Sequence, residues 1–335
     1  MRTHVISLRL LSVFLLGLVL ILASCGQGNN SQTSGGSTPA AQATPTPTPA
    51  LDAYGTPIAI PKTAPQRIVS LAPSISEILG ALHLEKRVVG VDAFTNYPAS
   101  LAGLKKVSSS SGINVEAIVA LKPDLVLSSG GLSKKYDTQL SQLGLQVVDL
   151  PSPNIAQTLD QIVLIGRLTH TESVANALVA QMKQQIAQVQ SQVKGTAATK
   201  TLLEVDDSTP GKPYVFGGGS FGDEMASYAN ATNIFHSNTT NGGYPQVTDE
   251  AIIAANPQYI ILTEDPMYGG QPSVVYKRAN WGGIAAVKSH HVYHINSDIM
   301  QRPGPRIVQG LRCLAQVVHP DKFSGALPSY CTASV

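Results

Sequence analysis

An internal repeat places one glutamate in each half of the chain. The two copies are EAIVALKP, which begins at Glu116, and EAIIAANP, which begins at Glu250, so they lie 134 residues apart. In each copy we expect a helix cap, a glutamate in the first helical turn, a proline that ends the short helix, and then a buried strand. The residues expected to cap these helices are Asn114 and Thr248.

These two glutamates allow two interpretations. In a purely structural role, each carboxylate complements the positive end of its own helix dipole. In a functional role, Glu116 and Glu250 stand exposed at the same place on each half and form a pair of acidic contacts for a partner with two basic sockets. The repeat also predicts that the two halves are similar α/β lobes.

A G-x-S-x-G sequence surrounds Ser220 and lies between a plausible strand and a helix. Asp298 and His319 follow it in the order found in α/β-hydrolases, so Ser220 is a candidate nucleophile. The glycines around Ser220 are also typical of a tight turn, and a helix in the middle of the chain would interrupt the continuous sheet that a hydrolase needs. We therefore expect no enzymatic activity and keep a Ser220-dependent hydrolase as the lesser alternative.

Three histidines, His290, His291 and His294, crowd one segment. A closed zinc site needs three or four converging ligands, whereas His290 and His291 would point to opposite faces of the strand that they begin. We expect surface or strand-edge histidines here and no metal site. A zinc or manganese receptor remains the alternative function.

The N-terminal residues indicate the compartment. Two arginines precede an apolar run of 14 residues, Leu10 to Ala23, which is short for a membrane span and typical of a secretion signal. The sequence LASC that ends at Cys25 resembles the bacterial lipobox, in which cleavage leaves a lipidated cysteine. We predict a signal peptide over 1–24 and a lipid on Cys25 that anchors the protein to the outer face of the cell membrane. An ordinary transmembrane anchor is the alternative.

The segment after Cys25 has the composition of a tether. Residues 26–50 contain no charge and nothing larger than glutamine, so they cannot bury enough apolar surface to fold. The TPTPTP sequence favours extended geometry. We predict that the lipidated cysteine and its disordered tether occupy 25–60.

Two further cysteines remain, Cys313 and Cys331, which are 18 residues apart. In an oxidising compartment this even remainder indicates a disulfide, and two buried free thiols are the alternative.

Length and charge limit the remaining possibilities. A chain of 335 residues has room for about two domains, and 43% hydrophobic with 13% charged residues is a globular composition. Loss of the two signal-peptide arginines would take the net charge from +2 to zero. No basic excess is then left to neutralise a phosphate backbone, so nucleic acid is excluded as an expected partner.

Short apolar runs alternate with helical patterns on both sides of a central helical segment, as the βα units of a parallel sheet require. The expected strands are residues 68–71, 88–91, 125–127 and 147–148, and then 202–205, 259–262 and 292–295. The fold class is therefore α/β. We predict an N-terminal lobe over 61–153, a helical segment over 154–195 and a C-terminal lobe over 196–335.

Within the helical segment, apolar residues recur at steps of three and four. They are Val174, Leu178, Met182, Ile186, Val189 and Val193. Thr171 can cap this helix and Gly195 can end it, which gives about 22 residues and roughly 33 Å. Its central position favours a single bridge between two lobes, and a surface helix within one domain is the alternative.

Six stretches resemble the extracytoplasmic binding proteins of ABC importers for cobalamin and ferric siderophores, most closely the cobalamin-binding branch. They are RIVSLAPSISEIL (67–79), VVGVDAFTNYP (88–98), GINVEAIVALKPDLVL (112–127), FGGGSFGDEM (216–225), GGYPQVTDEAIIAANPQYIIL (242–262) and RPGPRIVQGL (302–311). The resemblance implies two Rossmann-like lobes, one bridging helix with restricted hinge motion and a ligand cleft between the lobes. It also implies a monomer that works with a permease dimer and its ATPase subunits, with Glu116 and Glu250 as the docking carboxylates.

The same resemblance implies that the ligand meets Phe94, Tyr244, Asp298 and Arg302. A corrin is a flat macrocycle with an apolar face and an amide rim, which suits an aromatic wall with a few polar anchors. Ser74, at a helix start, could present backbone N–H groups to a rim acceptor. Ordinary packing at loop ends is the alternative for the two aromatic residues.

The chain departs from the cobalamin pattern at two places. Where relatives carry cleft tryptophans it has Ser110 and Ser129, and its only tryptophan, Trp281, lies elsewhere. The expected ligand is therefore cobalamin, another corrinoid or a ferric siderophore, and no separate cofactor is expected.

Overall fold

The structure, a computed structural model, describes residues 50–130, 134–151 and 154–332. The expected signal peptide, the lipidation of Cys25 and most of the expected tether lie outside these residues. Across the three described ranges, no helix combines the length and the apolar character needed to cross a membrane.

The N-terminal lobe is built on a parallel four-stranded sheet with the strand order β2-β1-β5-β6. The strands are β1 (Ile68–Ser70), β2 (Val88–Val91), β5 (Leu125–Ser129) and β6 (Val147–Leu150). A small antiparallel pair, β3 (Ser108–Ser109) and β4 (Gly112–Ile113), stands apart from this sheet. The helices of this lobe are α1 (Pro73–Ala81), α2 (Ala99–Ala102), α3 (Val115–Ala120) and α4 (Lys134–Gln142), with a 3-10 turn at Glu85–Arg87.

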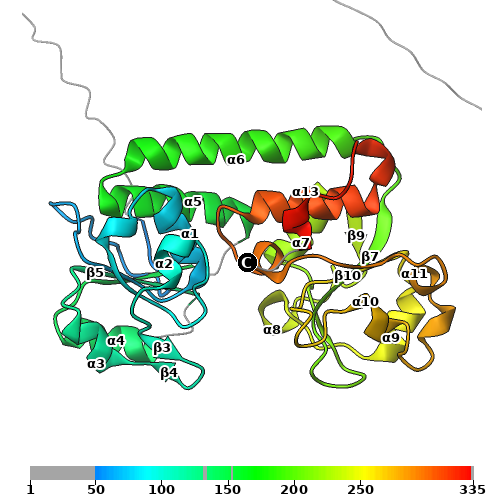
Figure 1. The fold of residues 1–335 in the computed structure, drawn as a ribbon, viewed down its shortest axis with the longest axis horizontal. Helices are drawn as coiled ribbons and strands as arrows, with labels where there is room; N and C mark the ends of the chain where they lie inside the picture. Colours follow the sequence, from blue (N-terminus) through cyan, green and yellow to red (C-terminus); the bar gives the residue numbers. More distant parts are fainter. Residues whose placement is uncertain (1–49, 131–133, 152–153, 333–335) are drawn as a thin grey trace, which may run out of the picture. The chain divides into compact units, whose positions relative to one another are not determined.

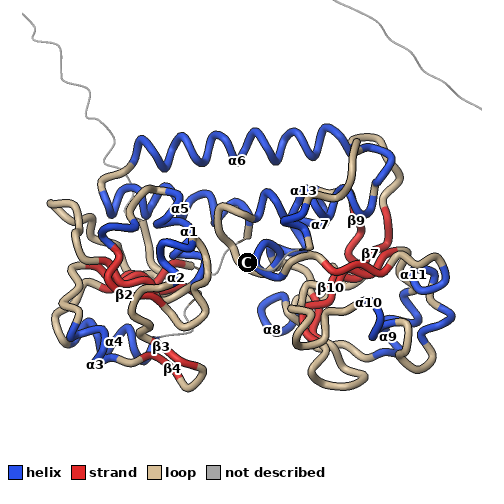
Figure 2. The backbone as a smooth tube through the Cα atoms, in the orientation of Figure 1, coloured by secondary structure: helices blue, strands red, loops and turns tan. Residues whose placement is uncertain are grey.

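The C-terminal lobe has its own sheet in the order β11-β10-β7-β8, with β9 also pairing with β7. The strands are β7 (Thr199–Asp206), β8 (Tyr214–Val215), β9 (Ala231–Asn233), β10 (Tyr259–Leu262) and β11 (Val292–His294), of which only β8 runs antiparallel to its neighbour. The helices are α7 (Phe221–Tyr228), α8 (Thr240–Gly243), α9 (Asp249–Ala255), α10 (Pro272–Val275), α11 (Ala285–Lys288), α12 (Ser297–Met300) and α13 (Ile307–Val318). Three 3-10 turns cover Trp281–Gly283, Pro320–Lys322 and Ser329–Cys331. The strands gather in two separate groups, one in each lobe, which confirms the predicted two-lobe α/β fold (Figure 2).

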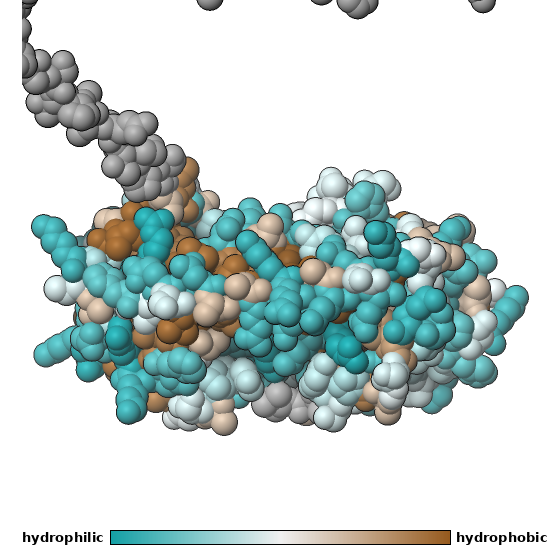
Figure 3. Space-filling view, turned by 90° about the horizontal axis from the view of Figure 1, so that it is seen from above, coloured by the Kyte–Doolittle hydropathy of each residue, from teal (hydrophilic) through white to brown (hydrophobic). Residues whose placement is uncertain are grey.

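Two helices lie between the sheets in sequence, α5 (Ile155–Thr169) and α6 (Glu172–Val193). Helix α6 packs against α5 and, further along, against α7 and α13 of the C-terminal lobe, so it runs over both lobes as the predicted bridge (Figure 1). Seen from the side of α6, the surface is mostly hydrophilic, with apolar patches over the half that carries the N-terminal lobe (Figure 3).

The buried face of α6 differs slightly from the predicted stripe. Met182, Ile186, Val189 and Val193 are buried, but in the first turns Ala175 and Val179 are buried in place of their neighbours Val174 and Leu178. The reason is close approach to α5, since a Cβ on Gly166 would lie 2.5 Å from the Cβ of Ala175. The expected cap at Thr171 is wrong in detail, because its side chain makes no capping bond and instead lies 2.8 Å from the Thr169 hydroxyl.

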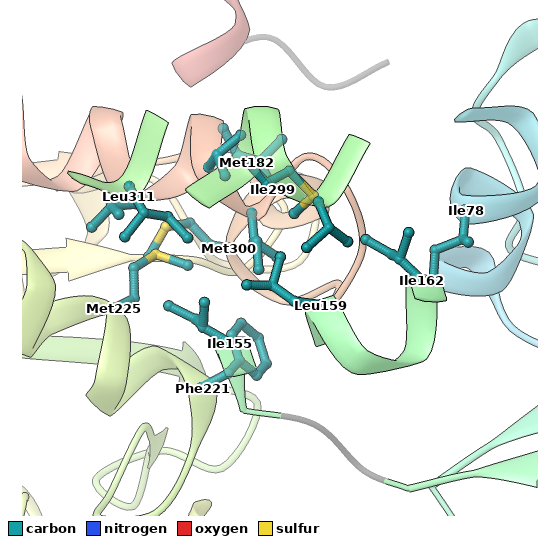
Figure 4. Packing of buried hydrophobic residues seen from close by; sticks show 14 of the residues in the cluster. Ile78, Ile155, Leu159, Ile162, Met182, Phe221, Met225, Ile299, Met300 and Leu311 are labelled. Carbon is teal, nitrogen blue, oxygen red and sulfur yellow. The ribbon is translucent and has the colours of Figure 1, made fainter. Parts of the chain in front are cut away.

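One apolar core contains residues from both lobes and joins them. Ile155 and Leu159 of α5 lie among Phe221 and Met225 of α7 and other C-terminal residues, while the next turn of α5 faces Ile78 of α1 (Figure 4). The backbone N–H of Ile155 also donates to a carboxylate oxygen of Glu224 on α7 at 2.6 Å. The lobes are therefore packed together through α5 as well as bridged by α6.

The folded body begins earlier than predicted, because residues 50–60 are not tether. The Ala53 N–H donates to the Asp149 carbonyl at 2.8 Å, and the Tyr54 hydroxyl donates to Asp137 at 2.7 Å. Ile58 and Ile60 pack partly buried against the main core. The composition of this segment did include apolar side chains, which is what allows it to pack.

At the other end of the described chain, Cys313 of α13 and Cys331 of the last 3-10 turn form a disulfide. The crosslink holds the C-terminal segment against α13, and the Asn296 N–H donates to the Cys331 carbonyl at 2.7 Å.

Candidate ligand cleft and docking residues

The two repeat copies fold as expected. The Asn114 side chain accepts from the Ala117 N–H at 2.9 Å at the start of α3, and the Thr248 hydroxyl accepts from the Ala251 N–H at 3.3 Å at the start of α9. Glu116 and Glu250 are both exposed. Helices α3 and α9 lie at the ends of their lobes that point away from α6 (Figure 1). The pKa of Glu250 is lowered by its own backbone N–H and by the Thr248 hydroxyl, so this carboxylate is charged at neutral pH.

Phe94 stands on a fixed loop after β2. Its N–H donates to the Asp92 carboxylate at 2.7 Å, and the Thr95 hydroxyl donates to the same carboxylate. The Thr95 carbonyl accepts from the Lys106 ammonium at 2.7 Å. The phenyl ring nevertheless stays 64% exposed. A rigid loop at the carboxyl end of a parallel strand therefore presents an apolar ring at the edge where ligands bind in open α/β sheets.

Asp298 and Arg302, both expected to contact ligand, belong to an ion cluster that joins the lobes. An Arg302 guanidinium nitrogen lies 2.7 Å from the Asp298 carboxylate and a second donates to the Asn96 side-chain oxygen at 2.5 Å. The Asn96 amide in turn donates to Asp298 at 3.1 Å. Asn96 belongs to the N-terminal lobe and the other two to the C-terminal lobe, so these contacts cross the junction.

Glu77 of α1 and Arg306 complete this inter-lobe ion cluster. Arg306 donates from Nε and Nη2 to the two Glu77 oxygens at 3.0 and 2.6 Å, and its guanidinium carbon lies 4.2 Å from the centre of the Tyr97 ring. Arg302 is 3.8 Å from Glu77, and Arg306 is 3.6 Å from Asp298. Burial raises the pKa of Glu77, against the opposing effect of both arginines.

The cluster holds two acidic and two basic side chains, so its formal charge is zero. The attraction between the paired charges offsets the free-energy cost of removing them from water. The cluster therefore has no net charge that could attract a ligand. Arg302 and Asp298 therefore lie at the junction of the lobes with their charges already paired. The sequence analysis missed Glu77 and Arg306, although a glutamate inside the apolar helix SISEIL is an unusual choice that needs a buried partner.

Ser74 and Tyr244 occupy different surroundings. Ser74 is buried in the first turn of α1, where a Cβ on Gly304 of the C-terminal lobe would lie 3.4 Å from its carbonyl oxygen. Ser74 therefore lies where α1 approaches the C-terminal lobe. Tyr244 is partly buried in the C-terminal lobe with its ring 5.5 Å from Phe216, and burial raises the pKa of its hydroxyl to about 12.

The C-terminal lobe contributes an acidic crevice that the sequence analysis also missed. It has a volume of about 470 Å³ and lies at the carboxyl ends of β7 and β10. Its lining includes Asp206, Glu264, Asp265, Tyr268 and Gln301. In the described part of the chain no cationic side chain pairs with the three carboxylates, whereas nearby Glu204 and Asp207 are both paired with Arg278.

Glu264 has the most perturbed carboxyl group in this crevice. Burial raises its pKa to about 7, and the neighbouring Asp207 carboxylate adds to the increase. Its proton is thus only partly lost at neutral pH. The crevice offers hydrogen-bond acceptors and negative charge, and Tyr268 and Met267 stand exposed beside it.

The three residues of the hydrolase alternative each have other partners. The Ser220 hydroxyl donates to the Gly217 carbonyl at 2.7 Å and accepts from the Asp223 N–H at 3.2 Å, which makes it the cap of α7. Asp298 is paired with Arg302, and His319 lies 3.2 Å from the Asn230 carbonyl. This glycine-rich turn thus serves to start a helix.

The histidine segment does not converge either. His291 stacks on Tyr259 at 4.6 Å between ring centres, and His290 lies 5.5 Å from the Tyr276 ring. Burial lowers the pKa of His294. Over the described ranges, no three histidine, cysteine or acidic side chains are grouped so that they could hold a metal ion.

Comparisons with known proteins agree with this architecture. The family described as periplasmic binding protein matches residues 68–299. An uncharacterized ABC transporter substrate-binding lipoprotein of Bacillus subtilis, YvrC, is 34% identical over 267 residues, which is 78% of this chain and 82% of that protein. A vitamin B12-binding protein of Vibrio cholerae is 27% identical over 259 residues, covering 76% of this chain and 90% of that protein.

A solved structure from Staphylococcus epidermidis, titled as a possible iron-binding (periplasmic solute-binding) protein, is also similar. It matches with a TM-score of 0.67 and 30% identity, covering 77% of this chain and 100% of that one. These relatives are substrate-binding transport proteins rather than enzymes. The chain belongs to the periplasmic binding protein family, as a substrate-binding protein of an ABC transporter.

Proposed function

We propose that this protein captures a corrinoid in the cleft between its lobes and delivers it to the permease of an ABC importer. The single observation that carries the choice of ligand is the contrast between the surfaces that would form the two walls of the proposed cleft. Phe94 presents an exposed ring on one lobe, and the crevice on the other lobe presents unpaired carboxylates. A flat apolar macrocycle with an amide rim matches both walls, because its face packs on the ring and its amide N–H groups donate to the carboxylates.

The charges around the proposed site argue against an anionic ligand. The arginines at the lobe junction are paired within the inter-lobe ion cluster, while among the described residues Asp206 and Asp265 have no cationic partner. A haem propionate or an anionic siderophore would therefore meet like charges. The vitamin B12-binding relative from Vibrio cholerae supports the corrinoid. The Staphylococcus epidermidis relative, titled as possibly iron-binding, makes a neutral or cationic ferric chelate the second candidate.

We further propose that Glu116 and Glu250 dock to arginines on the two permease subunits, and that a lipid on Cys25 holds the protein on the outer face of the membrane. The exposure of both glutamates and their placement on the same end of the two lobes support the docking role. The lipoprotein name of the Bacillus subtilis relative supports the anchor.

Calorimetric titration of residues 26–335, which lack the expected signal peptide and the lipidated cysteine, tests the ligand. We expect cyanocobalamin or cobinamide to bind with submicromolar affinity and haem or an anionic ferric siderophore to bind at least a hundredfold more weakly. Tight binding of haem or of an anionic siderophore, without binding of either corrinoid, would refute the assignment. Comparison of the two corrinoids also shows whether the lower nucleotide ligand of cobalamin is recognised.

Uptake by cells tests the docking residues. The double variant Glu116→Ala with Glu250→Ala should lose at least nine-tenths of uptake while its corrinoid affinity in solution stays within twofold. Equal loss of affinity and uptake would contradict a docking role for these two side chains.

A further inference from the structure

We propose that a groove beside Glu116 receives an apolar side chain of the permease, next to the arginine that pairs with Glu116. This inference rests on the proposed docking role of that glutamate and extends it to a specific surface. The groove has a volume of about 790 Å³ and lies between α3, α4 and the β3–β4 pair. The occupant is an extracytoplasmic loop of the permease that carries an arginine and a neighbouring aliphatic or aromatic residue.

The order of residues on α3 places charge and apolar surface side by side. Glu116, Val119 and Ala120 are separated by three and four positions, so they share one face of the helix. All three line the groove. A partner that pairs with the Glu116 carboxylate therefore brings its next side chains directly over Val119 and Ala120.

The α4 side of the groove adds an exposed apolar side chain next to the polar Gln139. Leu143, just after α4, is 56% exposed, and Val119 of α3 is 40% exposed. Tyr136 of α4 forms part of the floor because position 112 is glycine, since a Cβ there would lie 2.6 Å from the Tyr136 hydroxyl oxygen. Exposed aliphatic side chains that converge on a groove with a charged rim are typical of a protein-binding surface.

The second copy of the repeat serves as an internal comparison. On α9 the residue that corresponds to Val119 is Ile253, which packs partly buried against the core of the C-terminal lobe. The loop between β7 and β8 contacts the start of α9, since the Asp249 N–H donates to the Gly211 carbonyl at 3.1 Å. Ile253 thus packs within the C-terminal lobe, whereas Val119 of the N-terminal lobe stays available to a partner. The charge for docking is common to both lobes, but the apolar contact belongs to the N-terminal lobe.

Photocrosslinking in the native cells tests this surface without knowledge of the transported ligand. Three full-length variants each carry p-benzoylphenylalanine at a single position, in place of Leu143, Ala254 or Leu51. Ala254 is exposed one helical turn after Glu250, and Leu51, 50% exposed against α5, is the matched control for Leu143. We expect Leu143 to crosslink to the membrane subunit of an ABC importer, identified by mass spectrometry, and Leu51 to give at least tenfold less of this product. Glu116→Lys in the same chain should reduce the Leu143 crosslink at least fivefold.

The outcomes separate this inference from the function on which it rests. A permease crosslink at Ala254 without one at Leu143 would overturn the groove and leave the docking of Glu250 intact. Absence of permease crosslinks at both positions would overturn the docking proposal itself. A Leu143 crosslink that Glu116→Lys does not weaken would also overturn the inference. Binding in the groove would then be independent of the ion pair at Glu116.

Uptake gives a second measurement. Leu143→Ser and Val119→Ser should each lower uptake about fivefold while ligand affinity stays within twofold, and Leu51→Ser should change neither. Uptake unchanged in both groove variants would refute the role of the groove even where crosslinks form.

Discussion

The inter-lobe ion cluster makes a quantitative prediction about Arg306→Met. In the wild-type protein the Arg306 and Glu77 side chains are 9% and 1% exposed, and two hydrogen bonds of 3.0 and 2.6 Å join them. Methionine keeps most of the aliphatic stem but loses the guanidinium that lies over the Tyr97 ring, and its thioether packs well on aromatic rings in turn. The substitution therefore removes the charge with little loss of packing.

The expected loss in the free energy of unfolding depends on which cationic neighbour Glu77 keeps after the substitution. Its remaining cationic neighbour is Arg302 at 3.8 Å, which is itself paired with Asp298 at 2.7 Å. Removing one partner of a buried ion pair costs about 3–5 kcal/mol, because the other charge stays buried. We expect about 3 kcal/mol, the lower end, since Arg302 stays close and Glu77 can take up a proton. Burial already raises the pKa of Glu77, so the loss should shrink as pH falls.

The double variant Glu77→Leu with Arg306→Met distinguishes charge from packing. It removes one negative and one positive charge, so the remaining Arg302 and Asp298 stay balanced. Replacing both members of a buried pair by apolar residues is often close to neutral. We therefore expect the double variant to be more stable than either single variant, with a coupling energy of about 2 kcal/mol or more.

Urea unfolding at pH 7, followed by circular dichroism and by tryptophan fluorescence, measures these free energies. Trp281 is buried in the C-terminal lobe, so its fluorescence reports that lobe, while circular dichroism reports both. Wild type should give one transition by both probes, since the lobes share a core. Losses below about 1 kcal/mol in the single variants, or strictly additive losses in the double variant, would refute the interpretation of the cluster as a buried, coupled network.

Three further predictions concern other parts of the molecule. Phe94→Ala should weaken corrinoid binding about tenfold, or 1.4 kcal/mol, in calorimetry, with Phe94→Tyr near wild type; an unchanged affinity would move the apolar contact elsewhere. Burial and the Asp149 carboxylate raise the pKa of Asp137 to about 6, so the folded state binds protons more tightly than the unfolded state. Its contribution to stability is thus present at low pH and is lost as pH rises through about 6, and Asp137→Asn should flatten the dependence of the urea midpoint on pH between 4 and 7. Cys313→Ser with Cys331→Ser should lower the unfolding free energy by about 3 kcal/mol, as expected for an 18-residue loop, and a loss near zero would show that α13 is held by packing alone.

Much of the fold could be predicted because its signals are local. The predicted strands at 88–91 and 259–262 have the observed bounds of β2 and β10, since each is a continuous apolar run. Strand β7 begins three residues earlier than predicted, because Thr199 and Lys200 at its start carry no apolar signal and are recruited by pairing with β9. The helix α6 was predicted over its full length from periodicity, whereas the rotation of its buried face depends on Gly166 of a neighbouring helix.

The inter-lobe ion cluster could not be predicted in the same way. Glu77 and Arg306 are 229 residues apart, and nothing in the spacing of either shows that they meet. The resemblance named Arg302 and Asp298, but residue types alone do not show that their charges are paired with each other and with the opposite lobe. The acidic crevice could have been predicted, because Asp206 directly follows one predicted strand, Glu264 lies two residues after another, and ligands bind at the carboxyl ends of parallel strands.

The shared core and the ion cluster together bear on how a ligand is captured. The lobes are joined at the junction by the α5 side chains, by the α6 bridge and by buried charges from both lobes. Wide opening would expose that apolar surface and separate the Glu77–Arg306 pair, each at a cost of several kcal/mol. We therefore expect the two lobes to keep nearly fixed relative positions, so that little binding energy is spent on ordering them. If Glu116 and Glu250 dock to the permease as proposed, we expect the loaded protein to be recognised without a large change in lobe angle. Small displacements of α3 relative to α9 would then change the distance between the two docking carboxylates.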